Sequence, residues 1–266
     1  MQIGLASIDS LTNALRQKST NLNIVGGFTF GAAVEFAAWT HENETEESRP
    51  ILERWRSENP IYAEASNLLK GANVPASYQR HHRAQQGLRP IRSAQSVTGD
   101  AWYQFLERFA AALKAAGFGN GWNQAMAQVF HEMADNTVQH SELGTTEPIN
   151  GIAGYNVEER RMAFTVVDVG IGALNSLRDN PRYAEVSNGR EALDLIAHDK
   201  ASRRTEQYGP GGGYSALFLK LAAMDGIIRL RSGDGVFMME GTLGCSAIAR
   251  SLHTAPGFTI SVECKI

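Results

Sequence analysis

Cysteine is scarce in this chain, with only Cys245 and Cys264 among 266 residues. Two cysteines so far apart do not make a disulfide framework, and they indicate a reducing compartment. No apolar run approaches the roughly 20 residues that cross a bilayer. The opening residues M-Q-I-G-L-A-S-I-D-S also lack the basic flank and the long apolar segment of a signal peptide. We therefore expect a cytoplasmic protein that does not cross a membrane.

A strong excess of one charge is absent as well. The formal net charge is -3 and the isoelectric point is near 6.2. A chain balanced in this way has no general attraction to nucleic acid or to acidic membranes. Hydrophobic residues make up 43% of the chain and charged residues 20%. That composition suffices for one large domain, or for two modest domains with cores of their own.

The N-terminal region, residues 1–95, shows patterns for secondary structure but no strong functional motif. The patterns predict a strand over residues 22–30 and helices over residues 8–18, 32–40, 52–58 and 62–69. The acidic run over residues 41–50 is interpreted as a solvated loop. We expect a small α/β or helical domain that regulates the rest of the chain or binds a partner.

Residues 72–100 are polar and partly basic. They carry Arg80, His81, His82, Arg83, Arg89 and Arg92. One interpretation is a basic patch that meets a phosphate or an acidic partner, and the other is a solvated linker. The two histidines have no matching pair of ligands nearby, so no metal site is predicted.

The signals become clearer from residue 96 onward. Apolar periodicity predicts helices over residues 102–116 and 122–141, and β patterns predict strands over residues 152–156, 162–168 and 258–265. The segment I-I-R-L-R-S-G-D-G-V-F-M-M-E-G is predicted to form a β-hairpin with its turn at residues 232–235.

The predicted helix over residues 122–141 carries three polar side chains spaced four residues apart: Glu132, Asn136 and His140. Each step of four advances about 40° around a helix, so the three form one leaning stripe. Asn136 and His140 fall at the edge of the apolar face or inside it. Burying such groups unpaired costs about 1–3 kcal/mol each, so the stripe is expected to line a polar site.

Two glycine-containing segments follow this helix. The first, D-V-G-I-G, begins with Asp168 at the end of a strand, where glycines allow a sharp turn and close approach to a flat ligand; a plain tight turn also explains it. The second, G-P-G-G-G, precedes a predicted helix over residues 214–224 and could offer main-chain amides to phosphate. Between them, residues 173–208 are predicted to form a mobile lid that includes a helix over residues 189–197.

The chain resembles the GHKL ATPase superfamily in the order of its motifs. These are E-x-x-x-N-x-x-x-H on a helix, then D-x-G-x-G, then a lid, and then a glycine cluster that opens a second helix. Within it, H-E-M-A-D-N-T-V-Q-H-S and R-S-G-D-G look most like bacterial anti-sigma-factor serine kinases and their stand-alone relatives. The resemblance covers about residues 100–266. It implies an α+β fold, a two-layer Bergerat-type sandwich with a mixed, mostly antiparallel sheet and helices on one face. This ATP-binding domain would span residues 96–266.

The resemblance also implies roles for matching residues. Glu132 would be the general base, Asn136 would bind the magnesium ion, and Asp168 would accept a hydrogen bond from the adenine amino group. The further ATP contacts implied are His140, Gly170, Gly172, Lys200, Gly209, Gly211, Gly212 and Gly213, with Ser202 and Arg203 as weaker candidates. Two alternatives stay open. Glu132 is then an ordinary surface carboxylate, and His140 is a charge that the dipole favours at the C-terminus of a helix.

The chain departs from the family pattern in the last predicted strand and upstream of the ATP-binding region. Relatives usually begin that strand with a glycine-threonine pair, whereas here Gly257 is followed by Phe258 and then Thr259. No phosphoacceptor-histidine helix is evident upstream, which argues against a complete histidine kinase.

Two functions are consistent with these patterns. One is a magnesium-dependent ATPase or serine/threonine protein kinase in bacterial signalling or regulation. The other is a nucleotide-gated protein-interaction module whose lid switches a partner surface. Both imply ATP and Mg²⁺ and a regulatory protein partner, and both leave a homodimer open.

Overall fold

The computed structural model describes residues 3–17, 27–72, 85–119, 121–141, 150–198, 225–241 and 245–266. The elements in chain order are η1 (Leu5–Ser7), α1 (Ile8–Arg16), α2 (Phe30–Asn43), α3 (Arg49–Glu58), α4 (Pro60–Leu69), β1 (Gln86–Ile91), α6 (Gln95–Thr98), α7 (Asp100–Ala115), α8 (Trp122–Ser141), β2 (Gly151–Glu158), β3 (Arg161–Asp168), α9 (Gly172–Arg178), η2 (Pro181–Tyr183), α10 (Gly189–His198), β4 (Asp225–Glu240) and β5 (Cys245–Lys265).

The strands form one sheet in the order β1-β2-β3-β5-β4, and every pairing among these strands is antiparallel. The predicted α+β class with an antiparallel sheet is therefore confirmed. The predicted strands over residues 152–156, 162–168 and 258–265 lie within β2, β3 and β5. The predicted mixture of strand directions does not occur among the described strands.

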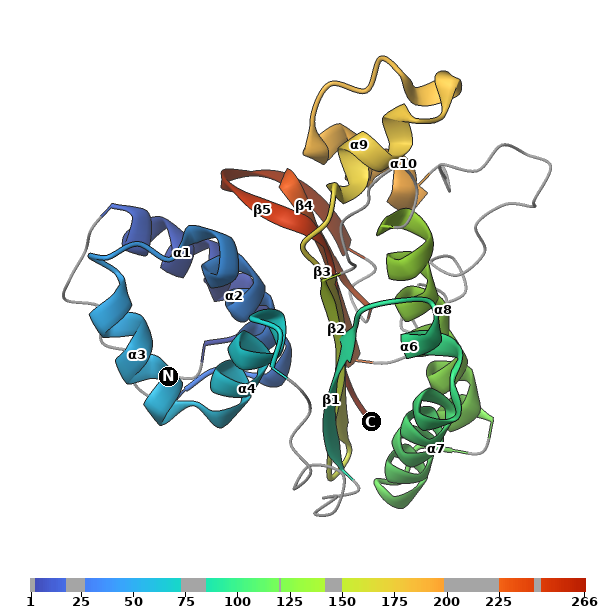
Figure 1. Cartoon of the computed structure of the whole chain (residues 1–266). Coiled ribbons are helices and arrows are strands. Elements are labelled where there is room, and N and C mark those ends of the chain that lie inside the picture. Colours follow the sequence, from blue (N-terminus) through green and yellow to red (C-terminus); the bar gives the residue numbers. More distant parts are fainter. Residues whose placement is uncertain are drawn as a thin grey trace.

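One face of the sheet is apolar and is covered by α7 and α8 (Figure 1). Phe109 of α7 lies 4.9 Å from Tyr155, and Phe130 of α8 lies 5.0 Å from Phe164, measured between ring centroids. Such rings bury large apolar areas and pack at preferred angles. The predicted amphipathic helices over residues 102–116 and 122–141 are both present, and their apolar faces form this core.

The opposite face of the sheet is covered by the N-terminal helices, which we call the N-terminal layer (α1–α4; Figure 1). Its helix α2 packs on β3 and β5, and it shares a core with Leu88, Ile152, Ala163 and Val167 of the sheet. Helices thus lie on both faces, not on one face as the resemblance implied. The difference arises because α2 is apolar almost all round and must be covered on every side.

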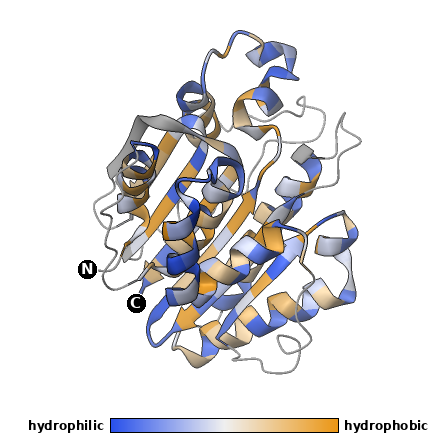
Figure 2. Ribbon diagram, turned by 60° about the vertical axis from the view of Figure 1, so that its left-hand side comes forward, coloured by the Kyte–Doolittle hydropathy of each residue, from blue (hydrophilic) through white to orange (hydrophobic). Residues whose placement is uncertain are grey.

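Alternation along the strands explains why the two faces differ. In β4, which α10 covers, Ile228 and Leu230 point into the apolar core, whereas Arg229 and Arg231 point to the N-terminal layer. Figure 2 shows this mixture of apolar and polar residues along the strands. A sheet with such alternation would ordinarily expose its polar face to water.

Acidic side chains from the N-terminal layer compensate for the burial of Arg229 and Arg231. Arg229 is 1% exposed, and its guanidinium donates to the Glu35 carboxylate at 3.0 Å and to Asp9 at 2.8 Å. Arg231 contacts Asp9 as well, and burial lowers the pKa of Arg231 to about 10. Buried charges need such pairing because water no longer solvates them.

The predicted hairpin with its turn at residues 232–235 is wrong. Strand β4 runs through this segment, and its partner is β5, with shifts of register between Arg231 and Gly235. The glycines there allow an irregular strand instead of a turn, with Gly233 at a φ of 54°. Asp234 accepts the main-chain N–H of Gly189 at 2.7 Å and so holds the start of α10 against the strand.

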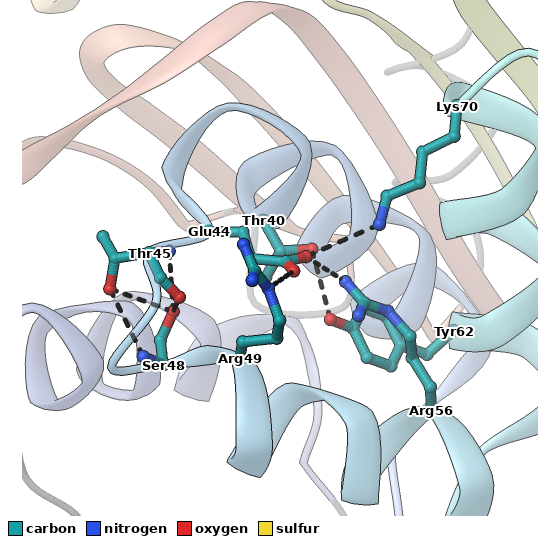
Figure 3. A network of polar contacts seen from close by, with 8 residues as sticks. All are labelled: Thr40, Glu44, Thr45, Ser48, Arg49, Arg56, Tyr62 and Lys70. Carbon is teal, nitrogen blue, oxygen red and sulfur yellow. Dashed lines mark hydrogen bonds and ion pairs between the residues drawn. The ribbon is translucent and has the colours of Figure 1, made fainter.

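The acidic run over residues 41–50 is not a simple solvated loop. Its Glu44 side chain is 16% exposed and forms ion pairs with Arg56, with Arg49 at 3.3 Å and with Lys70 at 3.6 Å (Figure 3). Burial alone would raise the pKa of Glu44, but hydrogen bonding and charge attraction from Arg56 hold it below its ordinary value. The carboxylate thereby joins α2, α3 and α4.

Residues 72–100 are not a plain linker either. They include β1, the strand at one edge of the sheet, and the short helix α6. The predicted boundary between residues 95 and 96 therefore falls after the first strand of the sheet. Arg80, His81, His82 and Arg83 lie outside the described residues, as does most of the predicted strand over residues 22–30.

Most of the predicted lid is folded onto the core. Helices α9 and α10 cover residues 172–178 and 189–198, and Leu177, Ala192 and Leu193 are buried in the core on the side of β4 and β5. The helix predicted over residues 189–197 is therefore present, but it packs on β4. The remaining ten residues of the predicted lid, 199–208, lie outside the described part of the chain. In the same described part, no helix is long and apolar enough to cross a membrane.

Candidate functional site

A buried carboxylate stands at the end of β3. Asp168 is 6% exposed and accepts the main-chain N–H of Gly170 at 2.8 Å. Burial raises its pKa from 3.8 to about 7, against the opposing effect of hydrogen bonds from the N–H groups of Gly170 and Phe258. A desolvated carboxylate whose pKa lies near neutrality is characteristic of a functional site.

Two glycines give the chain room around this carboxylate. A Cβ atom on Gly257 would lie 2.1 Å from the main-chain oxygen of Asp168 and 2.5 Å from its carboxylate. Gly172 has a φ of 76°, and a Cβ there would lie 2.9 Å from the Gly257 carbonyl oxygen. The expected sharp turn is therefore present at Gly172, whereas Gly170 contributes its N–H to Asp168.

Ser232 ties the same corner together. Its hydroxyl donates to the Gly257 carbonyl at 2.6 Å and accepts the main-chain N–H of Ala173 at 2.8 Å. It thus links β4, β5 and the first turn of α9. The sequence patterns predicted Ser232 to be a turn residue and did not predict Gly257 as part of the site. The visible signal was the proline-glycine step before the last predicted strand.

We predict that Gly257→Ala destabilises the protein by about 2–4 kcal/mol, because it combines a positive φ with a clash against buried backbone. Urea denaturation followed by circular dichroism measures this loss. Gly71→Ala is the control, since Gly71 also has a positive φ but nothing lies within 4 Å of a Cβ there. An equal loss in both variants would show that φ, and not the clash, dominates at Gly257.

Helix α8 crosses the sheet beside Asp168. Its Thr137 lies close to Gly151, where an added Cβ would lie 3.3 Å from the Thr137 methyl group, and Gly151 pairs with Asp168 across the β2–β3 ladder. The absence of a side chain at Gly151 therefore lets α8 approach the end of β3. Sequence reasoning missed this glycine because it depends on a contact between distant segments.

The polar stripe of α8 lies at the edge of its buried face. Glu132 and Asn136 are half-buried, and the residues that directly follow them, Met133 and Thr137, are buried. Glu132 accepts a hydrogen bond from Gln128 one turn earlier, at 3.1 Å. The predicted placement of Asn136 at the edge of the apolar face agrees with its half-buried position, and the chemical roles of Glu132 and Asn136 stay predictions.

The predicted magnesium site would need few protein ligands. No group of three or more His, Cys, Asp and Glu side chains is arranged for a metal ion among the residues that the structure describes. A magnesium ion bound chiefly through substrate phosphates needs only one or two protein oxygens, which the Asn136 amide could supply. The chemistry of the donor thus suits the predicted role.

The phosphate-binding half of the predicted site cannot be placed. The side chain of His140 and all of Lys200, Ser202, Arg203, Gly209, Gly211, Gly212 and Gly213 lie outside the described residues. The structure therefore places Asp168, Gly170 and Gly172 at the end of β3, and Glu132 and Asn136 on α8, whose Thr137 approaches that end through Gly151. The meeting of these residues around one nucleotide and the other ATP contacts stay predictions.

No known relative decides the assignment. No family model, curated protein or solved structure matches this chain. Function is therefore inferred from the residues and their geometry.

Proposed function

We propose that this chain binds ATP with magnesium in a GHKL-type site and hydrolyses it slowly or transfers its γ-phosphoryl group, in bacterial signalling or regulation. The observation that carries the proposal is the buried carboxylate of Asp168 at the end of β3. Glycine and main-chain groups, and no bulky side chain, contact this carboxylate at Gly170 and Gly257.

Adenine suits this carboxylate for a chemical reason. Its amino group is a donor, and an ionised carboxylate accepts such a bond strongly when water is excluded. Guanine presents a carbonyl oxygen at the equivalent ring position, so two acceptors would face each other. A carboxylate already held by Gly170 and Phe258 is also fixed in orientation, which reduces the entropic cost of binding.

The stripe on α8 would serve the phosphates. Asn136 would coordinate the magnesium ion, and Glu132 would orient or deprotonate the attacking water or hydroxyl. Phosphoryl transfer needs mainly positioning and charge neutralisation, so one carboxylate and one metal ligand on a rigid helix are an adequate protein contribution.

We predict that Glu132→Ala keeps ATP binding within about twofold and lowers turnover by about 100-fold or more, since general bases contribute about 10²–10⁴-fold. Phosphate release and calorimetric titration with Mg-ATP measure the two quantities. Glu107→Ala, which removes an exposed carboxylate from α7, is the matched control and should leave both unchanged. Unchanged turnover in Glu132→Ala would remove the assigned base.

The second candidate is a nucleotide-gated interaction module in which hydrolysis is incidental. The observation that favours it is the N-terminal layer, which is held on the back of the same sheet by ion pairs and could respond to the nucleotide. This function predicts that ATP changes partner affinity or oligomeric state in Glu132→Ala as well. Sedimentation of that variant with and without Mg-ATP separates the two functions.

A further inference from the structure

Asn150 joins the candidate site to the N-terminal layer. It directly precedes β2, and its main-chain carbonyl accepts the N–H of Val169, the residue after Asp168, at 3.0 Å. Its side-chain amide donates to the carbonyl of Leu69 at 3.2 Å and lies 3.3 Å from Nε2 of His41. One residue therefore contacts the Asp168 turn and the ends of two N-terminal helices.

Arg92 completes this junction. One guanidinium nitrogen donates to the Asn150 side-chain oxygen at 2.5 Å, and the other donates to the carbonyl of Leu68. Leu68 and Leu69 close α4, where carbonyl groups lack partners within the helix and the helix dipole favours a cation. Arg92 is half-buried, and burial lowers its pKa from the ordinary value.

We propose that Arg92 and Asn150 are positioning residues through which the N-terminal layer controls the affinity of the nucleotide site. The proposal rests on the proposed ATP-binding function. A shift of α4 would withdraw the Leu68 and Leu69 carbonyls from Arg92 and Asn150. Asn150 would then no longer fix the backbone at Val169, next to the carboxylate that receives the base.

Thermodynamic linkage makes the coupling reciprocal. If the docked position of α4 strengthens ATP binding, ATP must stabilise that docked position by the same free energy. The readout is hydrogen exchange at the end of α4, where the N–H groups of Lys70, Gly71 and Ala72 donate to main-chain carbonyls. A junction that is only a structural tether would not transmit nucleotide binding to these amides.

The experiment compares wild type with Arg92→Ala in the full-length chain. We expect Arg92→Ala to weaken Mg-ATP binding by about 5- to 150-fold, the usual range of coupling between sites, and Arg92→Lys to recover part of it. We also expect Mg-ATP to slow exchange at Lys70, Gly71 and Ala72 in wild type and not in Arg92→Ala. Calorimetry and exchange mass spectrometry measure the two effects.

Tyr62→Phe is the matched control. It removes a buried hydrogen bond to Thr40 within the same layer, 3.2 Å long, without touching the junction. It should lower the melting temperature and leave the ATP affinity unchanged. Loss of ATP affinity in Tyr62→Phe would mean that general destabilisation explains the result for Arg92→Ala, and would overturn the proposal.

The outcomes separate this inference from the function beneath it. Wild-type protein that does not bind Mg-ATP removes the proposed function and this inference together. Binding in wild type with equal affinity in Arg92→Ala overturns the inference alone. If Arg92→Ala does not fold, the wild-type exchange measurement decides, because exchange at the end of α4 that Mg-ATP does not slow overturns the coupling.

Discussion

Asp168→Asn should abolish ATP binding and at the same time stabilise the ligand-free protein at pH 8. With its oxygen kept on the Gly170 N–H, the amide would present its NH2 group where the adenine amino group needs an acceptor, so two donors would face each other in a buried site. We expect a loss of affinity of about 100-fold or more, since an unpaired buried polar group costs about 1–3 kcal/mol on each side.

The gain in stability follows from the pKa of Asp168. Its folded-state value of about 7 lies above the ordinary value of 3.8. The folded state therefore holds the proton more tightly, and the stabilisation from protonation is present at low pH and lost as the pH rises through 7. At pH 8 the buried carboxylate is ionised and costs free energy, which a neutral amide avoids. The difference between 3.8 and about 7 corresponds to a gain of up to about 4 kcal/mol for the variant at pH 8.

The wild-type protein should show the complementary pH dependence. Its ATP affinity should fall as the pH drops from 8 to 6, by up to about tenfold per pH unit below the pKa, because the ionised carboxylate is the better acceptor. Thermal shift with and without Mg-ATP at pH 6, 7 and 8 measures both effects for wild type and Asp168→Asn. Nucleotide-dependent stabilisation that persists in Asp168→Asn would refute the assigned role of Asp168.

Glu35→Ala should destabilise the protein by about 3–5 kcal/mol, the usual cost of leaving one partner of a buried ion pair alone. Arg229 is 1% exposed and donates three hydrogen bonds to Glu35, each 3.0 Å long. Asp9, at 2.8 Å, would remain as its partner, but that side chain is one-third exposed. Urea denaturation measures the loss.

The double variant Glu35→Leu with Arg229→Met tests the cause. Replacing both charges by apolar side chains of similar size should recover most of the stability, because neither ion then needs to be desolvated. Equal losses in the single and double variants would show that packing of α2, and not charge, holds this region. Limited proteolysis of the N-terminal layer would show whether Glu35→Ala also loosens its attachment to the sheet.

Local patterns predicted the elements that form the candidate site. The period of apolar residues along α8 depends only on neighbours three and four positions apart, so its bounds and its stripe of Glu132 and Asn136 could be predicted. The same holds for β3 and for Asp168 at its end. The error at Ser232 to Gly235 has a local cause too, since glycines suit a tight turn and an irregular strand equally well.

The sequence by itself determined the helix with the polar stripe, the strand that ends in Asp168, and the glycine at its turn. Only the tertiary structure decided that the N-terminal helices cover the back of the sheet, because Glu35 and Arg229 are 194 residues apart in the chain. The tertiary structure also decided that Gly151 lets α8 approach the sheet and that Gly257 packs on Asp168. It brought Arg92 and Asn150 to the end of α4. The physical reason is that periodicity reports which face of an element is apolar, whereas the partner of a buried charge or a missing Cβ is chosen by long-range packing.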